Sequence, residues 1–269
     1  MELMNLEVRV KSCKSAVSPS RLPGLDWAVN PYRGCSHACS YCYAQDVTRF
    51  ETSKEWGEVV EVKSGIVQRL RDELSRSSRR GVYGVGTVTD PYQPLEKEFQ
   101  LTRGCLEQLK RHDAKVSILT KSDLVLRDLD VLRGWPGVEI GISIGIIDRE
   151  AARLLEPGAP SPEDRFQALK VLVENDVPAY VMAAPMIPGI SDSEESIWKL
   201  AEATHDSGVD RIMWDRYNPK PLASSRLRRT LISKGTQLMP PHSVAEARGI
   251  RSCFQAACAR FHIDLVDAF

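Results

Sequence analysis

The chain has 269 residues, with 36 basic and 36 acidic side chains and an apolar share of 42%. The balanced charge provides no global field that would attract nucleic acid or anionic lipid, and the apolar share is ordinary for a packed core. The first residues, MELMNLEVRVKSCKS, lack the apolar stretch of a secretory signal, and no apolar run approaches membrane-spanning length, so we expect a soluble, cytoplasmic protein.

After an N-terminal extension of residues 1–26, predicted strands and helices alternate along the chain. Strands are predicted at residues 27–32, 81–90, 115–122, 138–145, 178–185 and 209–215. Helices are predicted around Ile66, Val67, Leu70 and Leu74, at 101–112 and 124–133, from a capping box of Ser161 and Asp164 to Asn175, from a cap of Asp192 and Glu195, and at 242–261. Six strand–helix units, two short of an eightfold barrel, predict an α/β fold with a parallel sheet and crossover helices.

The predicted domains are a barrel at residues 27–240 and a C-terminal unit at 241–269, whose last residues, HIDLVDAF, form a strand or plug against it. Polar residues follow all six predicted strands. They are the cysteine loop, Thr89-Asp90, Thr120-Lys121, Ser143, residues 185–189 and residues 215–219. Because active sites gather at the carboxyl ends of parallel strands, this regularity predicts one active site on one rim.

Three cysteines, Cys35, Cys39 and Cys42, stand close together in NPYRGCSHACSYCYAQ. Clustered cysteines in a reducing compartment are more often ligands or catalysts than disulfides. Iron–sulfur clusters normally take four thiolates, so a 4Fe–4S cluster held by three leaves one iron open. The alternative is a structural zinc site completed by His37. The remaining cysteines are scattered and receive no predicted role beyond core packing: Cys13, Cys105, Cys253 and Cys258.

The spacing C-x3-C-x2-C followed by the aromatic Tyr43 resembles the radical S-adenosylmethionine (radical SAM) enzymes. Further blocks are similar to the branch that contains spore photoproduct lyase and the proteins labelled DNA repair photolyase-like. They are GTVTDPYQPLEKEFQLTR, ILTKSDLVLRDLDVL, LLEPGAPSPEDRFQALKVL and PMIPGISDSEES. The resemblance extends from about residue 15 to residue 215.

The resemblance implies a partial (β/α)6 barrel, in agreement with the count of strand–helix units. It also implies a 4Fe–4S cluster and S-adenosylmethionine, which is cleaved reductively to methionine and a 5′-deoxyadenosyl radical. That radical abstracts hydrogen from a substrate, and a flavodoxin- or ferredoxin-like protein supplies the electron.

The same resemblance implies a role for single residues. Cys35, Cys39 and Cys42 correspond to the cluster ligands, and Tyr43 lies beside the adenine. Thr89 and Asp90 lie where the family binds the methionine amino group, Lys121 where it binds the carboxylate or ribose, and Ser143 where it binds the ribose. A zwitterion needs such acceptors and such a cation. The alternatives are a solvated loop lysine at 121, a buried strand hydroxyl at 143 and a turn cap at 90.

One position departs from the branch. Spore photoproduct lyase has a cysteine after its second strand that returns a hydrogen atom to the repaired thymine, and Thr87 occupies the matching position here. A threonine O–H bond is too strong for that role, so lyase activity on spore DNA is not expected.

The substrate is unidentified, because the sequence does not separate a nucleic acid from a peptide or a small molecule. Basic runs at 68–81 and 225–235 are compatible with nucleic acid. Arg216 and Tyr217 are predicted to contact the substrate, and Glu156 is predicted to brace a loop by pairing with Arg165. The alternative to an enzyme is an iron–sulfur electron-transfer protein, which would not need the polar residues on the rim.

Overall fold

The main sheet has the curved, mostly parallel arrangement that the alternating pattern predicts. The computed structural model describes residues 6–50, 54–76 and 80–268. Eight strands pair in the order β11-β10-β9-β8-β7-β6-β3-β2. They are β2 (Val17–Pro19), β3 (Trp27–Val29), β6 (Val82–Val85), β7 (Lys115–Thr120), β8 (Val138–Ser143), β9 (Ala179–Met186), β10 (Arg211–Arg216) and β11 (Asp264–Asp267). The six strands from β3 to β10 are mutually parallel, which confirms the α/β partial barrel with six strand–helix units.

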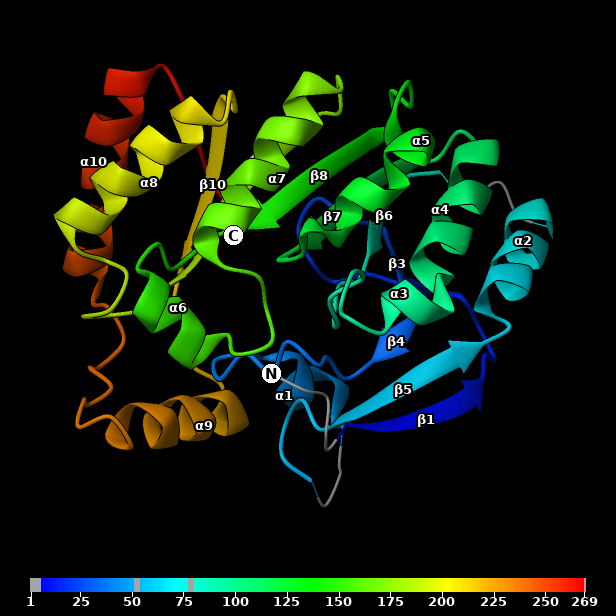
Figure 1. Ribbon diagram of the computed structural model, residues 1–269, viewed down its shortest axis with the longest axis horizontal. Helices are drawn as coiled ribbons and strands as arrows, with labels where there is room; N and C mark the ends of the chain where they lie inside the picture. Colours follow the sequence, from blue (N-terminus) through cyan, green and yellow to red (C-terminus); the bar gives the residue numbers. More distant parts are fainter. Residues whose placement is uncertain (1–5, 51–53, 77–79, 269) are drawn as a thin grey trace.

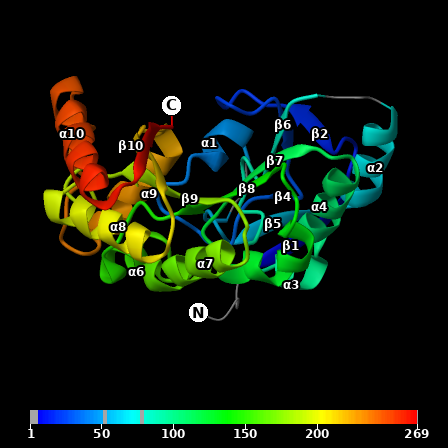
Figure 2. The same cartoon turned by 90° about the horizontal axis from the view of Figure 1, so that it is seen from above.

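Helices cover the convex side of this sheet (Figure 1). The larger ones on this side are α2 (Ile66–Arg76), α4 (Leu101–Arg111), α7 (Pro162–Glu174), α8 (Glu194–Asp206) and α10 (Val244–Phe261), whereas α9 (Pro221–Ile232) packs against the short helices α1 and α6. The short ones are α1 (Ala44–Thr48), α3 (Glu96–Phe99), η1 (Asp123–Asp128), α5 (Leu129–Leu132) and α6 (Arg149–Leu155). Figure 2 places α2 and α10 at opposite ends of the molecule, so the helices follow the sheet from end to end.

The core lies between these helices and the sheet. Ile118, Ile140 and Ile212 point from β7, β8 and β10 into the layer that Leu106 and Leu169 fill from the helices, and all five are fully buried. Burial of such side chains stabilises the fold by roughly 1.5–3 kcal/mol each. The alternate side chains of the same strands point to the concave side of the sheet.

Two of the predicted helix starts can be checked against their caps. The capping box at the start of α7 is confirmed, since the Ser161 hydroxyl accepts from the backbone N–H of Asp164 and the Asp164 carboxylate accepts in return. The cap of α8 was predicted wrongly, because Ser193 accepts from the backbone of Ser196 and Asp192 instead accepts from Gly189, 2.7 Å away. The predicted helix at 124–133 consists of the 3₁₀ turn η1 followed by the single turn α5.

A second, smaller sheet was not predicted. It contains β1 (Glu7–Ser12), β5 (Val59–Ser64) and β4 (Tyr32–Arg33) in the order β1-β5-β4. The predicted strand at 27–32 is therefore wrong at its end, because the chain leaves the main sheet at Asn30-Pro31 and Tyr32 joins the second sheet. Residues 1–26 also contribute paired strands, since β1 pairs with β5 and β2 runs antiparallel to β3.

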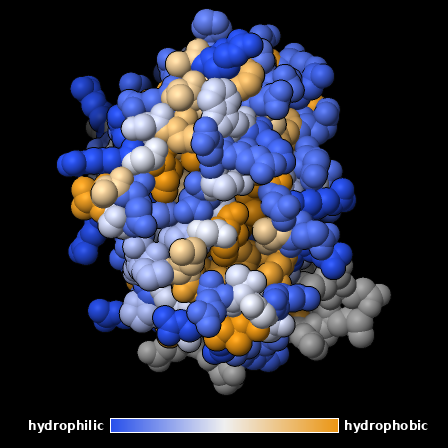
Figure 3. Space-filling view, turned by 90° about the vertical axis from the view of Figure 1, so that its left-hand side faces the viewer, coloured by the Kyte–Doolittle hydropathy of each residue, from blue (hydrophilic) through white to orange (hydrophobic). Residues whose placement is uncertain are grey.

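The C-terminal residues extend the main sheet. The predicted helix at 242–261 begins after Ser243, which forms a capping box with Glu246, and β11 then pairs in parallel with β10. Figure 3 shows the side of the molecule that carries α10, where hydrophilic side chains surround patches of hydrophobic ones. Within the described part of the chain, no helix is both long enough and apolar enough to cross a membrane.

Candidate active site

A cavity of about 630 Å³ lies on the concave face of the main sheet. It reaches the carboxyl ends of the strands, where ligands of open α/β sheets and barrels bind. The structure brings together in its lining all eight residues that the sequence assigned to the cluster and cosubstrate: Cys35, Cys39, Cys42, Tyr43, Thr89, Asp90, Lys121 and Ser143. The cysteine loop and the polar residues after β6, β7 and β8 thus meet in one cavity, whereas residues 185–189 and 215–219 do not line it.

The cysteine loop follows β4 and holds its three thiols at one end of this cavity. Burial raises the pKa of all three thiols, and that of Cys39 reaches about 12. Backbone N–H groups of His37 and Ala44 oppose this at Cys35 and Cys42, because an amide directed at sulfur stabilises the thiolate. Buried thiols with amide donors have the chemistry of iron–sulfur ligands.

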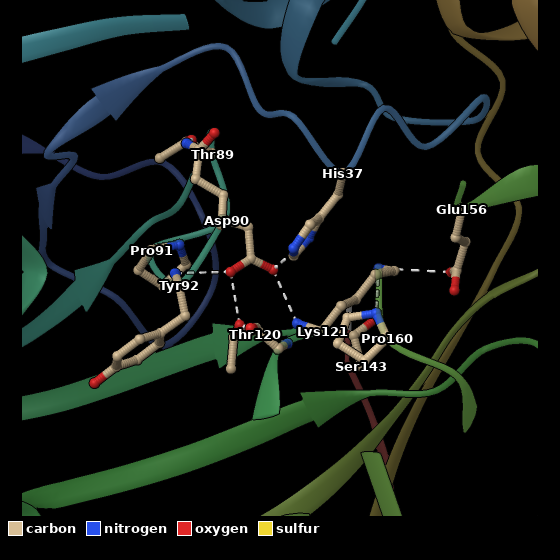
Figure 4. A network of polar contacts seen from close by, with 12 residues as sticks. His37, Thr89, Asp90, Pro91, Tyr92, Thr120, Lys121, Ser143, Glu156 and Pro160 are labelled. Carbon is tan, nitrogen blue, oxygen red and sulfur yellow. Dashed lines mark hydrogen bonds and ion pairs between the residues drawn. The ribbon is translucent and has the colours of Figure 1, made fainter. Parts of the chain in front are cut away.

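The donor set suits a cluster better than a single ion. Among the residues that the structure describes, no three His, Cys, Asp or Glu side chains are arranged to hold one metal ion. In a 4Fe–4S cluster each thiolate binds its own iron, so the ligands stand further apart. The His37 ring, the candidate fourth ligand for zinc, is directed at the Asp90 carboxylate with 3.2 Å between Nδ1 and Oδ2 (Figure 4).

Asp90 is engaged by the protein on both of its carboxylate oxygens. Oδ1 accepts from the Thr120 hydroxyl at 2.6 Å and from the Tyr92 backbone at 2.9 Å, and Oδ2 accepts from the Lys121 backbone at 2.8 Å and faces His37 (Figure 4). Burial alone would raise the pKa of Asp90, but the charge and hydrogen bonds of these neighbours outweigh it and hold the pKa at about 2.

These contacts give the Thr89-Asp90 pair a structural role. Asp90 accepts three hydrogen bonds and faces His37, and the Thr89 hydroxyl already donates to the Gly34 carbonyl at 2.6 Å and accepts from Gln93 at 3.0 Å. The contact of Asp90 with the methionine amino group, which the resemblance implies, stays a prediction. Asp90 joins the loops after β6 and β7 to the cysteine loop.

Lys121 and Ser143 meet at the ends of β7 and β8. The Lys121 Nζ lies 2.9 Å from the Ser143 hydroxyl, 3.9 Å from a Glu156 carboxylate oxygen and 5.5 Å from the centre of the Tyr41 ring. Glu156 forms the predicted ion pair with Arg165, with 2.5 Å between the charged atoms and both side chains fully buried. The prediction that Glu156 braces a loop is confirmed.

The segment that contains Glu156 contacts the cysteine loop directly. The Tyr41 hydroxyl, between Cys39 and Cys42 in sequence, donates to Glu156, and the Gly158 N–H donates to the His37 carbonyl at 3.0 Å. A Cβ at Gly158 would lie 2.2 Å from the Ser36 carbonyl oxygen, closer than any real contact. Residues 156–158 therefore fit against the cysteine loop with no spare space.

Replacing Gly158 by alanine is expected to lower the free energy of unfolding by about 2 kcal/mol, because the added methyl group must push the cysteine loop away. Urea unfolding measures the loss, and the iron content after reconstitution should fall with it. Gly249→Ala is the matched control, since nothing lies within 4 Å of its added Cβ. Equal stability of the two variants would show that the contact at Gly158 is loose.

Tyr43 and Thr87 are in contact across the mouth of the cavity. The Tyr43 hydroxyl donates to the Thr87 carbonyl at 3.0 Å, and the Thr87 hydroxyl lies 3.1 Å from the Asn30 amide nitrogen. The Tyr43 side chain is 40% exposed although it lines the cavity, which leaves a ring surface free for a ligand.

The structure separates the two predicted substrate residues from this cavity. Tyr217 is buried in an apolar cluster with its hydroxyl 2.8 Å from that of Ser224, and neither it nor the exposed Arg216 lines the cavity. The concave wall is instead formed by Tyr180, Met182 and Met213. Strand alternation could have identified them, because they occupy the positions opposite to the core-facing residues of β9 and β10.

The sequence profile of the Radical SAM superfamily matches residues 29–202, which include the cysteine loop and the ends of β6 to β9. The chain belongs to the radical SAM superfamily. It is therefore a radical SAM enzyme, and the cofactors of this family are a 4Fe–4S cluster and S-adenosylmethionine.

Two relatives are uncharacterised proteins. One, from Methanocaldococcus jannaschii, is 37% identical over 198 residues that cover 74% of each chain. The other, from Mycobacterium tuberculosis, is 34% identical over 201 residues, which are 72% of this chain and 59% of that relative.

Among solved structures, spore photoproduct lyase matches with a TM-score of 0.74 at 14% identity over 97% of this chain and 82% of that one. Structures of that protein include a complex with dinucleoside spore photoproduct and a mutant with bound AdoMet. At this identity the match supports the fold of a radical SAM barrel and leaves the substrate of this chain to be inferred separately.

Proposed function

We propose that Cys35, Cys39 and Cys42 hold the 4Fe–4S cluster of this radical SAM enzyme and leave one iron free for S-adenosylmethionine. The observation that carries this proposal is the shared cavity, which joins the three thiols to Lys121 and Ser143 at the carboxyl ends of the strands. When bound, the cluster and cosubstrate supply reductive cleavage of S-adenosylmethionine to methionine and a 5′-deoxyadenosyl radical.

In this proposal, each of three side chains of the cavity binds a different part of the cosubstrate. Lys121 provides the cation for the methionine carboxylate, Ser143 bonds the ribose, and the free ring face of Tyr43 packs beside the adenine. Asp90 acts through others, because it fixes the Lys121 backbone and the His37 ring relative to each other.

The substrate is proposed to enter along Tyr180, Met182 and Met213, where the wall is largely apolar and excludes water from the radical. Hydrogen abstraction from a carbon atom held there is the reaction that this site supports. A flavodoxin- or ferredoxin-like protein is the proposed electron donor. None of the seven cysteines forms a disulfide, which supports a reducing, cytoplasmic location.

The test is anaerobic reconstitution with iron and sulfide, followed by reduction with dithionite in the presence of S-adenosylmethionine. We expect 5′-deoxyadenosine and methionine in equal amounts by chromatography, and neither without reductant. A protein that binds iron and sulfide but releases no 5′-deoxyadenosine would be an electron-transfer protein instead.

The same preparation is not expected to repair dinucleoside spore photoproduct, the ligand seen in the lyase structure. By the resemblance, Thr87 occupies the position of the hydrogen-donating cysteine, and its hydroxyl accepts a hydrogen bond from Asn30. Chromatography of the dinucleoside after turnover measures this. Accumulation of repaired thymine would show that hydrogen return does not need the cysteine.

A further inference from the structure

The charged side chains around Glu156 carry a net positive charge. Glu156 carries the single negative charge between two cations, Arg165 and Lys121, and the exposed fractions of the three side chains are 0%, 0% and 14%. A buried ion pair contributes little net stability once its desolvation is counted, so stability alone does not explain why these charges lie here. The surplus positive charge lies at Lys121, on the cavity side.

Arg165 is held so that it cannot move toward the cavity. Its Nε and one terminal nitrogen donate to the Pro160 carbonyl at 3.0 and 2.7 Å, and its other terminal nitrogen donates to the Ser143 carbonyl at 3.0 Å. The Glu156 carboxylate is therefore fixed on its Arg165 side. Its other oxygen receives the Tyr41 hydroxyl, and that same oxygen lies 3.9 Å from Lys121.

Lys121 and Tyr41 thus share one carboxylate oxygen, which the hydroxyl engages by a hydrogen bond and the lysine by charge alone. The charges of Arg165 and Lys121 lower the pKa of Glu156 against the effect of burial, and the Tyr41 hydroxyl donates a hydrogen bond to it. Glu156 is therefore an anion placed between Arg165 and Lys121. At 3.9 Å the lysine is attracted to Glu156 without a hydrogen bond, so the N–H groups that it does not donate to Ser143 remain available on the cavity side.

We propose that Glu156 is a positioning residue that sets how much of the Lys121 charge is offered to the carboxylate of S-adenosylmethionine, and that Tyr41 controls it by occupying the shared oxygen. The cysteine loop and the cosubstrate site are then linked through one hydrogen bond. This inference rests on the proposed function, because it takes Lys121 as the cosubstrate cation.

Two substitutions should change cosubstrate affinity in opposite directions. Tyr41→Phe leaves the oxygen to Lys121, which is drawn into a full ion pair, so the dissociation constant for S-adenosylmethionine should rise about tenfold. Glu156→Gln removes the competing anion, so the dissociation constant should fall about threefold. Equilibrium dialysis of radiolabelled S-adenosylmethionine against the reconstituted, oxidised protein measures both without turnover.

Three further variants make the test specific. Tyr32→Phe removes a buried hydroxyl from another glutamate–arginine pair, since Tyr32 donates to Glu96 and Glu96 pairs with Arg127 at 2.9 Å. It should lower the melting temperature and leave the dissociation constant unchanged. Glu163→Gln, at an exposed position, should change neither. In a Lys121→Met background, Tyr41→Phe should have no further effect on affinity.

The outcomes are distinguishable. Weaker binding in both Tyr41→Phe and Glu156→Gln, in step with lower stability and lower iron content, would show that the cluster of charges is only structural and would overturn the inference. If Glu156→Gln does not fold, Tyr41→Phe alone decides it, since an unchanged dissociation constant there also overturns it. Wild-type protein that binds a cluster but no S-adenosylmethionine would contradict the proposed function instead.

Discussion

Replacing Cys35, Cys39 or Cys42 singly by alanine is expected to lower 5′-deoxyadenosine formation by at least about a thousandfold, to the background level. With two thiolates left, the cluster loses its anchorage and no site for reductive cleavage of S-adenosylmethionine remains. Iron and sulfide content after anaerobic reconstitution, measured beside 5′-deoxyadenosine, should fall in all three variants.

Cys253→Ala is the matched control for this series. Cys253 is half-buried on α10, far in sequence from the cysteine loop, and it does not line the cavity. Its replacement should leave iron content and 5′-deoxyadenosine unchanged. A cysteine-loop variant that keeps full iron content and full activity would show that its thiol is not a ligand.

The second large effect is expected at Asp90. Replacement by asparagine should lower the free energy of unfolding at pH 7 by about 3 kcal/mol, because a buried carboxylate with four polar neighbours is exchanged for an amide that cannot accept from all of them. Urea unfolding measures the change. Asp130→Asn should cost less than about 1 kcal/mol, because the Asp130 side chain is 64% exposed in its pair with Arg103.

The same carboxylate predicts a pH dependence. Its pKa in the folded protein is about 2, below the ordinary value of 3.8, so ionised Asp90 stabilises the fold above about pH 4. That contribution, about 2 kcal/mol, is lost as the pH falls from 4 toward 2. For cluster-free protein, the free energy of unfolding should fall more steeply with decreasing pH in the wild type than in Asp90→Asn. Parallel plots of the free energy of unfolding against pH would contradict the assignment.

The alternation of strands and helices was sufficient to predict the main sheet. Each unit is local in sequence, and residues such as Ile66, Leu70 and Leu74 show the period of a helix packed on one face. The placement of Lys121 and Ser143 at neighbouring strand ends followed from the same pattern, because parallel strands bring their carboxyl ends to one edge.

The second sheet could not be predicted in this way. β1 and β5 are separated by 46 residues of sequence between Ser12 and Val59, and β1 precedes the first strand of the barrel. Pairing between such distant segments leaves no local signal. The break of the first predicted strand at Pro31 has the same origin, since only the second sheet gives Tyr32 a partner.

Side-chain roles were predictable only where residue type limits them. A lysine or a thiol at the rim admits few roles, whereas Asp90 could serve a ligand or the protein, and only its four contacts show that the protein uses it. Tyr217 has the chemistry of a substrate contact, but packing turns its ring into an apolar cluster. The Tyr41–Glu156 link joins residues 115 positions apart, and no local pattern could indicate it.

Electron paramagnetic resonance of the dithionite-reduced protein, recorded with and without S-adenosylmethionine, tests the central claim most directly. A cluster held by Cys35, Cys39 and Cys42 with one iron open to the cosubstrate predicts a reduced 4Fe–4S signal whose line shape changes when S-adenosylmethionine is added. A reduced cluster signal that is identical in both samples would contradict it.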